Sequence, residues 1–179
     1  MGEYELSAAD ALVIFGITGD LAKKMTYQAL YRMEATGQLH CPIIGVAVEP
    51  WSTDQLRDAM RAALEASGED INNVVFDRLA KRVSYVHGDF KDASTYAALA
   101  KALSAAQHPL YYLEIPPFLF APVVAALGSA NLVDGATVMI EKPFGHDLAS
   151  AQALNDQLHE VLHENQILRV DHFLGKQPV

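Results

Sequence analysis

The fold of this chain is constrained most by one stretch, in which a strand, a glycine turn and a helix start follow one another between Ala11 and Ala22. The apolar run at 12–15 is typical of a buried strand, and Gly16 ends it where the backbone has to bend sharply. Gly19 leaves no Cβ between the helix N-terminus and a molecule that docks there. Because the first N–H groups of a helix point outward and favour anions, the stretch predicts a phosphate cradle.

The spacing of this turn is G-x-x-G-D-L, whereas the usual dinucleotide fingerprint G-x-G-x-x-G has glycines where Thr18 and Leu21 stand. A hydroxyl donor from Thr18 and the nearby Lys23 and Lys24 nevertheless favour a bound anion. Cations in a first helical turn meet the positive end of the helix dipole at a cost of roughly 0.3–1 kcal/mol each, which an anion offsets. The alternative, an ordinary turn with solvated lysines, stays open on these residues alone.

Strand-type runs and helical patterns alternate along the rest of the chain. The expected strands are 11–15, 43–48, 83–86, 110–115, 136–140 and 167–170, and the expected helices are 21–36, 52–67, 92–103, 119–127 and 148–163, with a helical excursion within 69–82. In the first helix, apolar residues recur at helical spacing at Leu21, Met25, Ala29, Leu30 and Met33. Continuous apolar strands separated by helices predict an α/β fold of the Rossmann type, in which helices cover both faces of a doubly wound, mainly parallel six-stranded sheet. We expect one dinucleotide-binding domain over 1–179, with strand order 3-2-1-4-5-6.

The composition narrows the classes of partner and compartment. Twenty-two acidic and thirteen basic residues give a formal charge of −9, which leaves no basic face for nucleic acid. The single Cys41 excludes an internal disulfide, and the sequence has neither a signal peptide nor an apolar run long enough for a membrane span. We therefore expect a cytoplasmic protein with no membrane or nucleic-acid partner.

Polar residues or prolines follow each expected strand: Thr18, Glu49, Asp89, Pro116-Pro117, Glu141-Lys142-Pro143 and Asp171-His172. Ligands of parallel sheets bind at this edge, so we expect Glu49, Asp89, Lys142 and Pro143 among the cofactor contacts. Asp89 has the alternative role of capping the next helix, and Lys142 that of a solvated turn lysine beside an X-Pro bond that can be cis. The histidines lack the spacing of metal ligands, so no metal site is expected.

The segment Arg169-Val-Asp-His-Phe-Leu-Gly-Lys176 gathers three functional side chains just after the last expected strand. Lys176 can pair with a phosphate, His172 can donate a hydrogen bond to it, and Asp171 can orient a histidine that acts as a base. The alternative is a helix entrance with Asp171 as its cap.

Three separated motifs, Gly16–Lys24, Glu141–Leu148 and Arg169–Lys176, closely resemble the glucose-6-phosphate dehydrogenase family in order and spacing. The stretch Tyr112-Leu-Glu-Ile-Pro-Pro117 also resembles that family, although Glu114 replaces a small residue. The resemblance implies hydride transfer from C1 of β-D-glucose 6-phosphate to NADP or NAD, which gives the 6-phosphogluconolactone and opens the oxidative pentose phosphate pathway.

The resemblance also implies a role for each matching residue. It implies a cofactor turn made of Gly16, Thr18, Gly19, Asp20 and Leu21, a turn set by Pro143, contacts from Lys142 to both cofactor and sugar, and sugar-phosphate contacts from His172 and Lys176. Asp171 matches the aspartate that orients the catalytic histidine. In the family that histidine lies in a second α+β domain, which supplies most of the oligomer interface. We therefore expect this chain to lack the base and that domain, and expect the full-length protein to be a homo-oligomer.

The choice of cofactor is where the sequence departs from the family. Many members carry an arginine for the 2′-phosphate of NADP where this chain has Val48, followed by Glu49. An acidic residue about 30 residues beyond the glycine turn is typical of binding to the ribose hydroxyls of NAD, so we expect NAD to be accepted. In the alternative, Glu49 turns into solvent and a lysine supplies the missing charge. Two other functions stay open, another sugar oxidoreductase and a stand-alone dinucleotide-binding module without catalysis.

Overall fold

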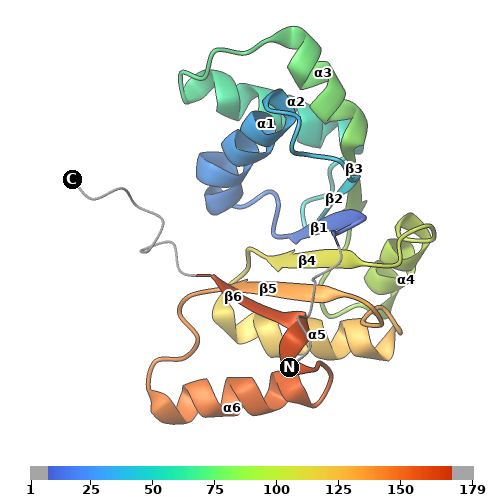
Figure 1. Ribbon diagram of the computed structural model, residues 1–179, viewed down its shortest axis with the longest axis vertical. Helices are drawn as coiled ribbons and strands as arrows, with labels where there is room; N and C mark the ends of the chain where they lie inside the picture. The colour runs from blue at the N-terminus through green and yellow to red at the C-terminus, as the bar shows by residue number, and fades with distance from the viewer. Residues whose placement is uncertain (1–7, 171–179) are drawn as a thin grey trace.

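The computed structural model describes residues 8–170 and contains one all-parallel sheet of six strands (Figure 1). The strands are β1 (Ala11–Phe15), β2 (Ile43–Ala47), β3 (Val83–His87), β4 (Pro109–Leu113), β5 (Thr137–Glu141) and β6 (Ile167–Val170). Their order, β3-β2-β1-β4-β5-β6, confirms the predicted Rossmann topology. The strand order reverses between β1 and β4, which is the point where such folds bind their ligands.

Helices cover both faces of the sheet, as predicted. On one face lie α1 (Tyr27–Ala35), α2 (Thr53–Ala66) and α3 (Asn73–Arg82), and on the other lie α4 (Ala93–Ala102), α5 (Phe120–Ser129) and α6 (Leu148–His159). Short helical segments η1 (Ala22–Thr26), η2 (Pro117–Leu119) and η3 (Glu164–Gln166) join the main elements. The neighbours Ile14 and Phe15 of β1 are both fully buried, one in each core, which explains why the strand reads as continuously apolar.

The buried face of α1 differs from the expected one. Met25 and Met33 are 48% and 37% exposed, whereas Tyr27, Tyr31 and Glu34 are buried. The cause lies in η1, a π-helical turn, because its wider winding rotates the following residues relative to the α-helical pattern. The two tyrosines are compatible with burial because their hydroxyls donate hydrogen bonds to backbone carbonyls, that of Tyr27 to Ile17 O at 2.6 Å.

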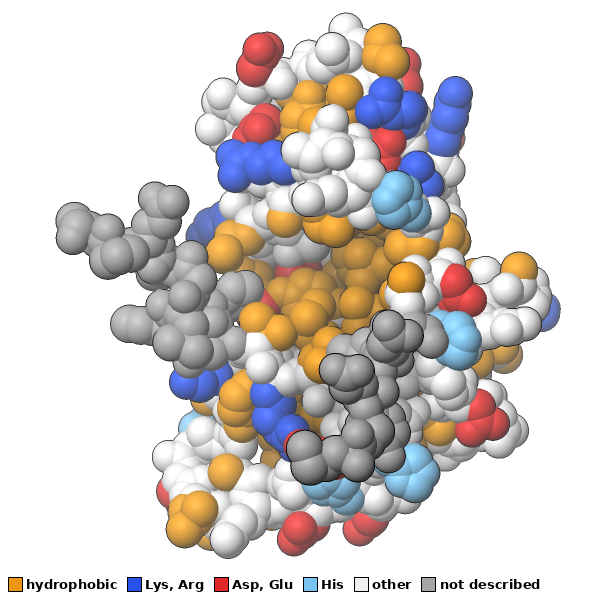
Figure 2. Space-filling model, in the orientation of Figure 1, with side chains coloured by type: hydrophobic (Ala, Val, Ile, Leu, Met, Phe, Trp, Pro, Cys, Tyr) orange, Lys and Arg blue, Asp and Glu red, His pale blue; other side chains and the backbone are white. Residues whose placement is uncertain are grey.

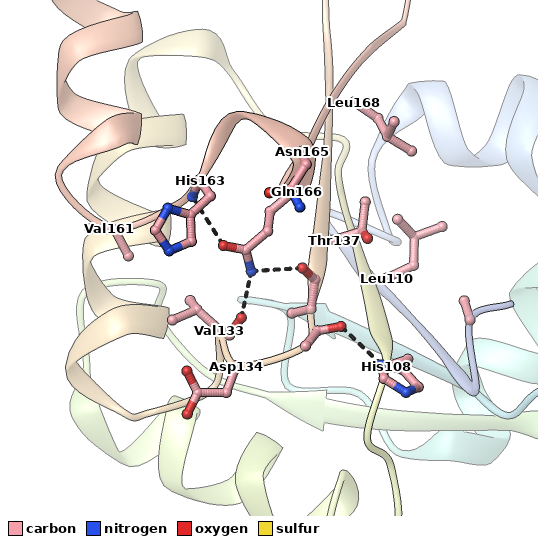
Figure 3. Close-up of a pocket in the computed structure, with 13 residues that line it drawn as sticks. His108, Leu110, Val133, Asp134, Thr137, Val161, His163, Asn165, Gln166 and Leu168 are labelled. Atoms are coloured by element: carbon pink, nitrogen blue, oxygen red, sulfur yellow. Dashed lines mark hydrogen bonds between the residues drawn. The ribbon is translucent and has the colours of Figure 1, made fainter. Parts of the chain in front are cut away.

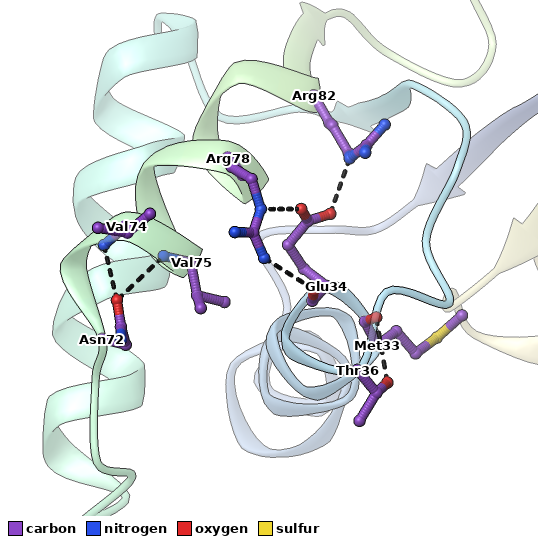
Figure 4. Close-up of polar contacts among 8 residues, drawn as sticks. All are labelled: Met33, Glu34, Thr36, Asn72, Val74, Val75, Arg78 and Arg82. Atoms are coloured by element: carbon purple, nitrogen blue, oxygen red, sulfur yellow. Dashed lines mark hydrogen bonds and ion pairs between the residues drawn. The ribbon is translucent and has the colours of Figure 1, made fainter.

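A buried carboxylate joins α1 to α3 (Figure 4). Glu34 is 3% exposed and accepts hydrogen bonds from Nε of Arg78 at 2.9 Å and Nε of Arg82 at 2.8 Å. Burial by itself would raise the pKa of Glu34, but the hydrogen bonds and charges of the two arginines outweigh burial and lower it. The excursion predicted within 69–82 is therefore a regular helix, capped by Asn72 and tied to α1 through two ion pairs.

Several element ends differ by a few residues from the sequence expectation. The helix predicted to run to 163 ends at His159, because the chain then turns into η3 before the last strand. Among residues 8–170, no helix is long and apolar enough to cross a membrane.

Candidate functional site

The glycine turn after β1 lies at the switch point of the sheet and can hold no other residue at its first position. Gly16 has φ +82°, and a Cβ there would lie 2.3 Å from the carbonyl oxygen of Glu114. Its N–H donates to Val46 O at 2.8 Å, and its carbonyl accepts from Gly19 N at 2.8 Å. The ends of β1, β2 and β4 therefore meet at a residue that has no side chain.

The second glycine of the turn is exposed and has one close backbone contact. Gly19 is exposed, and a Cβ there would meet one atom outside its immediate neighbours, Gly16 O at 3.1 Å. No side chain caps η1 at its N-cap residue Leu21, and the side chains of Lys23 and Lys24 are exposed on η1. An uncapped helix start beside two cations is an arrangement that favours anions. Asp20 is also exposed at this turn.

Thr18 is directed away from the exposed surface of the turn. Its side chain is buried, and its hydroxyl donates a hydrogen bond of 2.5 Å to Oε2 of Glu49, the residue that follows β2. The backbone carbonyl of Glu49 accepts hydrogen bonds from the hydroxyl of Tyr85 and from Trp51 N, both at 2.7 Å. The structure thus joins two predicted site residues to each other and holds Glu49 half-buried beside the turn.

The surroundings of two tyrosines near Glu49 raise the pKa of each phenol above its ordinary value. Burial and then the charge of Glu49 raise the pKa of Tyr85 to about 12. Burial, followed by the charges of Glu114, Tyr85 and Glu49, raises the pKa of Tyr27 further. Both phenols therefore act as hydrogen-bond donors to backbone carbonyls at neutral pH, and the anionic groups near the turn are the carboxylates.

The strands β4 and β5 bring two more carboxylates to this edge. Glu114 accepts a hydrogen bond from the Thr26 hydroxyl of η1, and the largely buried Glu141 accepts one from the Tyr112 hydroxyl. The next residues, Lys142 and Pro143, are exposed, and the peptide bond between them is cis, as their setting in a tight turn suggested. The exposed Lys142 therefore lies beyond the end of β5, on the edge that carries the glycine turn.

Asp89 has a local role in the loop after β3. Its carboxylate accepts a hydrogen bond from Lys91 N at 2.9 Å, and its carbonyl accepts one from the Thr95 hydroxyl at 2.7 Å. The N-cap position of α4 is occupied by Asp92, so Asp89 does not cap that helix. Asp171, His172 and Lys176, which the sequence assigns to the sugar side, lie outside the described residues.

Three pockets of the described residues lie away from the glycine turn. One, of about 510 Å³, is found at the amino ends of β4, β5 and β6, at the opposite edge of the sheet (Figure 3). Its most central polar side chain, Gln166, donates to the carbonyls of Val133 and Ala136 and accepts from His163 N. These bonds hold the loops before β5 and β6 together, so the amide of Gln166 has a structural role in this pocket.

An apolar hollow lies between the two groups of helices (Figure 2). Leu110, Tyr112, Met139 and Leu168 alternate along β4–β6 with the residues that pack on α4–α6, and they are half-buried on the opposite face. This face is apolar, so the charged groups of the site belong to the strand ends. Within 8–170, no three His, Cys, Asp or Glu side chains gather in a way that could hold a metal ion.

Comparisons with known proteins identify the domain. The sequence model of a family described as glucose-6-phosphate dehydrogenase, NAD binding domain, matches residues 13–179. Glucose-6-phosphate 1-dehydrogenase 1 of Mycobacterium tuberculosis is 58% identical over 172 residues, which cover 96% of this chain and 37% of that protein. Glucose-6-phosphate 1-dehydrogenase of Bacillus subtilis is 34% identical over 94% of this chain and 36% of that protein. The chain thus spans somewhat over a third of the length of these curated relatives.

Solved structures give the same result for the fold. The crystal structure of glucose-6-phosphate 1-dehydrogenase from Mycobacterium avium superimposes with a TM-score of 0.91 at 57% identity, over 95% of this chain and 37% of that one. A glucose-6-phosphate dehydrogenase in complex with its substrate glucose-6-phosphate superimposes with a TM-score of 0.84 at 31% identity, over 93% of this chain and 37% of that one.

Proposed function

The chain belongs to the glucose-6-phosphate dehydrogenase family through its NAD-binding domain, and from this premise we propose that it binds a nicotinamide dinucleotide for the oxidation of glucose 6-phosphate. The observation that carries the proposal is the glycine turn. Gly16 admits no side chain because Glu114 O fills the space, while Gly19 leaves the helix start open toward the solvent. A pyrophosphate on this turn would meet backbone N–H groups and the exposed Lys23 and Lys24.

In the proposed reaction the cofactor, when bound, accepts a hydride from C1 of β-D-glucose 6-phosphate while a base takes the proton of the C1 hydroxyl. Lys142 is proposed to contact both cofactor and sugar, because its exposed side chain follows β5 on the edge that carries the glycine turn. Pro143 would set the direction of that turn. His172 and Lys176 are proposed to bind the sugar phosphate, because imidazole and ammonium groups donate charge-assisted hydrogen bonds to phosphate oxygens.

Asp171 is proposed to orient a histidine base supplied from outside these 179 residues. A positioned general base typically contributes about 10²–10⁴-fold to the rate, so we propose that the chain by itself binds cofactor with little turnover. This chain matches 37% of the length of its Mycobacterium tuberculosis relative. The rest of such a relative can hold a further domain with that base and with an oligomer interface.

We also propose that NAD is accepted and is preferred over NADP. Glu49 lies half-buried at the end of β2, where an acidic residue in this fold accepts hydrogen bonds from the ribose hydroxyls. A carboxylate about 4 Å from a phosphate charge is opposed by up to roughly 4 kcal/mol at an effective dielectric near 20. Val48 is 52% exposed and offers no group that pairs with a 2′-phosphate.

Titration of the 179-residue chain with NAD and with NADP, followed through the fluorescence of its single tryptophan, tests the proposal. Trp51 is two residues from Glu49 and half-buried, so a dinucleotide at this edge should change its emission. We expect saturable binding of both cofactors and no steady formation of reduced cofactor when glucose 6-phosphate is added. Failure of both cofactors to bind would overturn the proposed site, and rapid turnover would overturn the assignment of the base to a region outside this chain.

A further inference from the structure

The hydroxyl of Thr18 and the carboxylate of Glu49 form a pair that the sequence assigned to two separate contacts. Thr18 is 5% exposed, and its hydroxyl donates to Glu49 Oε2 at 2.5 Å, across 31 residues of sequence. The second oxygen, Oε1, has no hydrogen-bond partner among residues 8–170. One face of the carboxylate is therefore fixed by the protein, and the other remains able to accept a hydrogen bond from a ligand.

The backbone of Glu49 is held as firmly as its side chain. Its carbonyl accepts hydrogen bonds from the Tyr85 hydroxyl and from Trp51 N, both at 2.7 Å. The hydroxyl of Tyr85 is a donor at neutral pH, and burial and the charge of Glu49 raise its pKa to about 12, further above neutrality. With backbone and carboxylate both fixed, Glu49 has little freedom to swing away from a charged ligand.

We infer that Thr18 is a positioning residue for cofactor selection, which acts by holding the Glu49 carboxylate against the adenine-side ribose. This inference rests on the proposed binding of a dinucleotide at the glycine turn. A fixed carboxylate accepts hydrogen bonds from the 2′- and 3′-hydroxyls of NAD without first losing side-chain freedom. The same fixed charge repels the 2′-phosphate of NADP, whereas an unrestrained Glu49 could rotate into water and escape the repulsion.

Thr18 therefore strengthens the discrimination between NAD and NADP without contacting the cofactor. A second acid at this edge offers a comparison, since Glu114 accepts a hydrogen bond from the buried Thr26 of η1, on the side of β4 rather than β2. The adenine half of a dinucleotide lies over the β1–β2 side of the switch point in this fold. The Thr26–Glu114 pair should thus have no influence on the choice between a ribose hydroxyl and a 2′-phosphate.

The test compares the ratio of the NADP and NAD dissociation constants in four variants of the chain, measured through Trp51 fluorescence. Thr18→Val removes the donor, and we expect the ratio to fall about tenfold toward NADP, which corresponds to the loss of one hydrogen bond to a charged group. Thr18→Ser keeps the hydroxyl and should retain the wild-type ratio. Thr26→Val makes the same chemical change in the matched pair and should leave the ratio unchanged. Thr18→Ala provides a second removal of the donor if the valine variant does not fold.

A double-mutant cycle with Glu49→Ala separates this inference from the proposed function. On the Glu49→Ala background, Thr18→Val should add no further change to the ratio, because its effect runs through the carboxylate. If Glu49→Ala shifts the ratio while Thr18→Val and Thr18→Ala do not, Glu49 selects the cofactor without Thr18 and the inference is overturned. Additive effects of the two substitutions would overturn it as well. If Glu49→Ala leaves the ratio unchanged, the proposed contact between Glu49 and the ribose is wrong, independently of the results for Thr18.

Discussion

Two carboxylates pack beside the first helical layer in opposite ways. Glu34, near the C-terminal end of α1, is buried between the guanidinium groups of Arg78 and Arg82 (Figure 4). Glu49, next to the glycine turn at the other end of this layer, is half-buried, and its side chain is held by the neutral hydroxyl of Thr18. The charge of Glu34 is balanced by two cations within the protein. The charge of Glu49 is not balanced by its hydroxyl partner, so its carboxylate can still interact with a ligand through its charge and its second oxygen.

The difference shows how the same residue type is directed to structure or to binding. Arginine partners neutralise Glu34 and lower its pKa, which stabilises the packing of α1 against α3. A hydroxyl fixes the position of Glu49 without neutralising it. An uncompensated negative charge at the strand ends lowers the stability of the domain without ligand, and such local costs are expected near ligand sites.

The largest expected effect concerns the ion pairs of Glu34 with Arg78 and Arg82. Replacing both arginines, Arg78→Met with Arg82→Met, leaves the 3%-exposed Glu34 without its cations, and we expect a loss of about 3 kcal/mol of unfolding free energy. Urea denaturation followed by Trp51 fluorescence measures it. Lys81→Met, an exposed change on the same helix, is the control and should have little effect. Equal losses in the two variants would show that Glu34 contributes nothing through its arginines.

The next largest effect concerns the glycine turn beside Glu49. Gly19→Val would place a branched side chain over the open helix start, where a phosphate is proposed to bind, and we expect affinity for both cofactors to fall by about thirtyfold, or roughly 2 kcal/mol. Ala29→Val adds a branched side chain at an exposed position of α1 and should leave cofactor affinity unchanged. Fluorescence titration measures the affinity of both variants. Unaltered affinity in Gly19→Val would show that the phosphates do not bind at this turn.

A smaller effect is expected from reversing the charge beside the ribose. Val48→Arg with Glu49→Ser should shift the preference about tenfold toward NADP, about 1.4 kcal/mol, because a guanidinium pairs with the 2′-phosphate. The matched control, Val74→Arg with Asp77→Ser, makes the same change in net charge at exposed positions of α3. An equal shift in the control would mean that overall charge, and not the position of Glu49, sets the preference.

The smallest expected effect is the pH dependence of the structural carboxylate. Since the pKa of Glu34 is lowered in the folded protein, its stabilisation is present above the unfolded pKa of about 4.3 and is lost as the pH falls through the folded pKa. Glu34→Gln should therefore lower the unfolding free energy by about 1 kcal/mol at pH 7, and by less below about pH 4. Urea denaturation at several pH values checks this, and a deficit that grows on acidification would contradict it.

The sequence predicted the main features of the site but not its internal partners. The glycine turn, the turn at Lys142-Pro143 and the position of Glu49 could be located because turn residues and strand ends follow local rules. The pairing of Thr18 with Glu49 was missed, because a short polar side chain beside a glycine turn has the same local pattern whether it faces a phosphate or a carboxylate. A threonine one residue before Gly19 and an acid just past β2 are the signals that could have suggested it.

The sequence by itself determined the order of strands and helices, because apolar periodicity and glycine turns are properties of neighbouring residues. It also determined the parallel sheet, since alternating strands and helices permit few other arrangements. Only the tertiary structure decided that Met25 and Met33 face solvent while Glu34 is buried, because the π-helical turn rotates α1 and the arginines come from a helix 44 and 48 residues further along. The environment of a charge is set by side chains that the fold brings together from distant parts of the chain, and no local pattern encodes it.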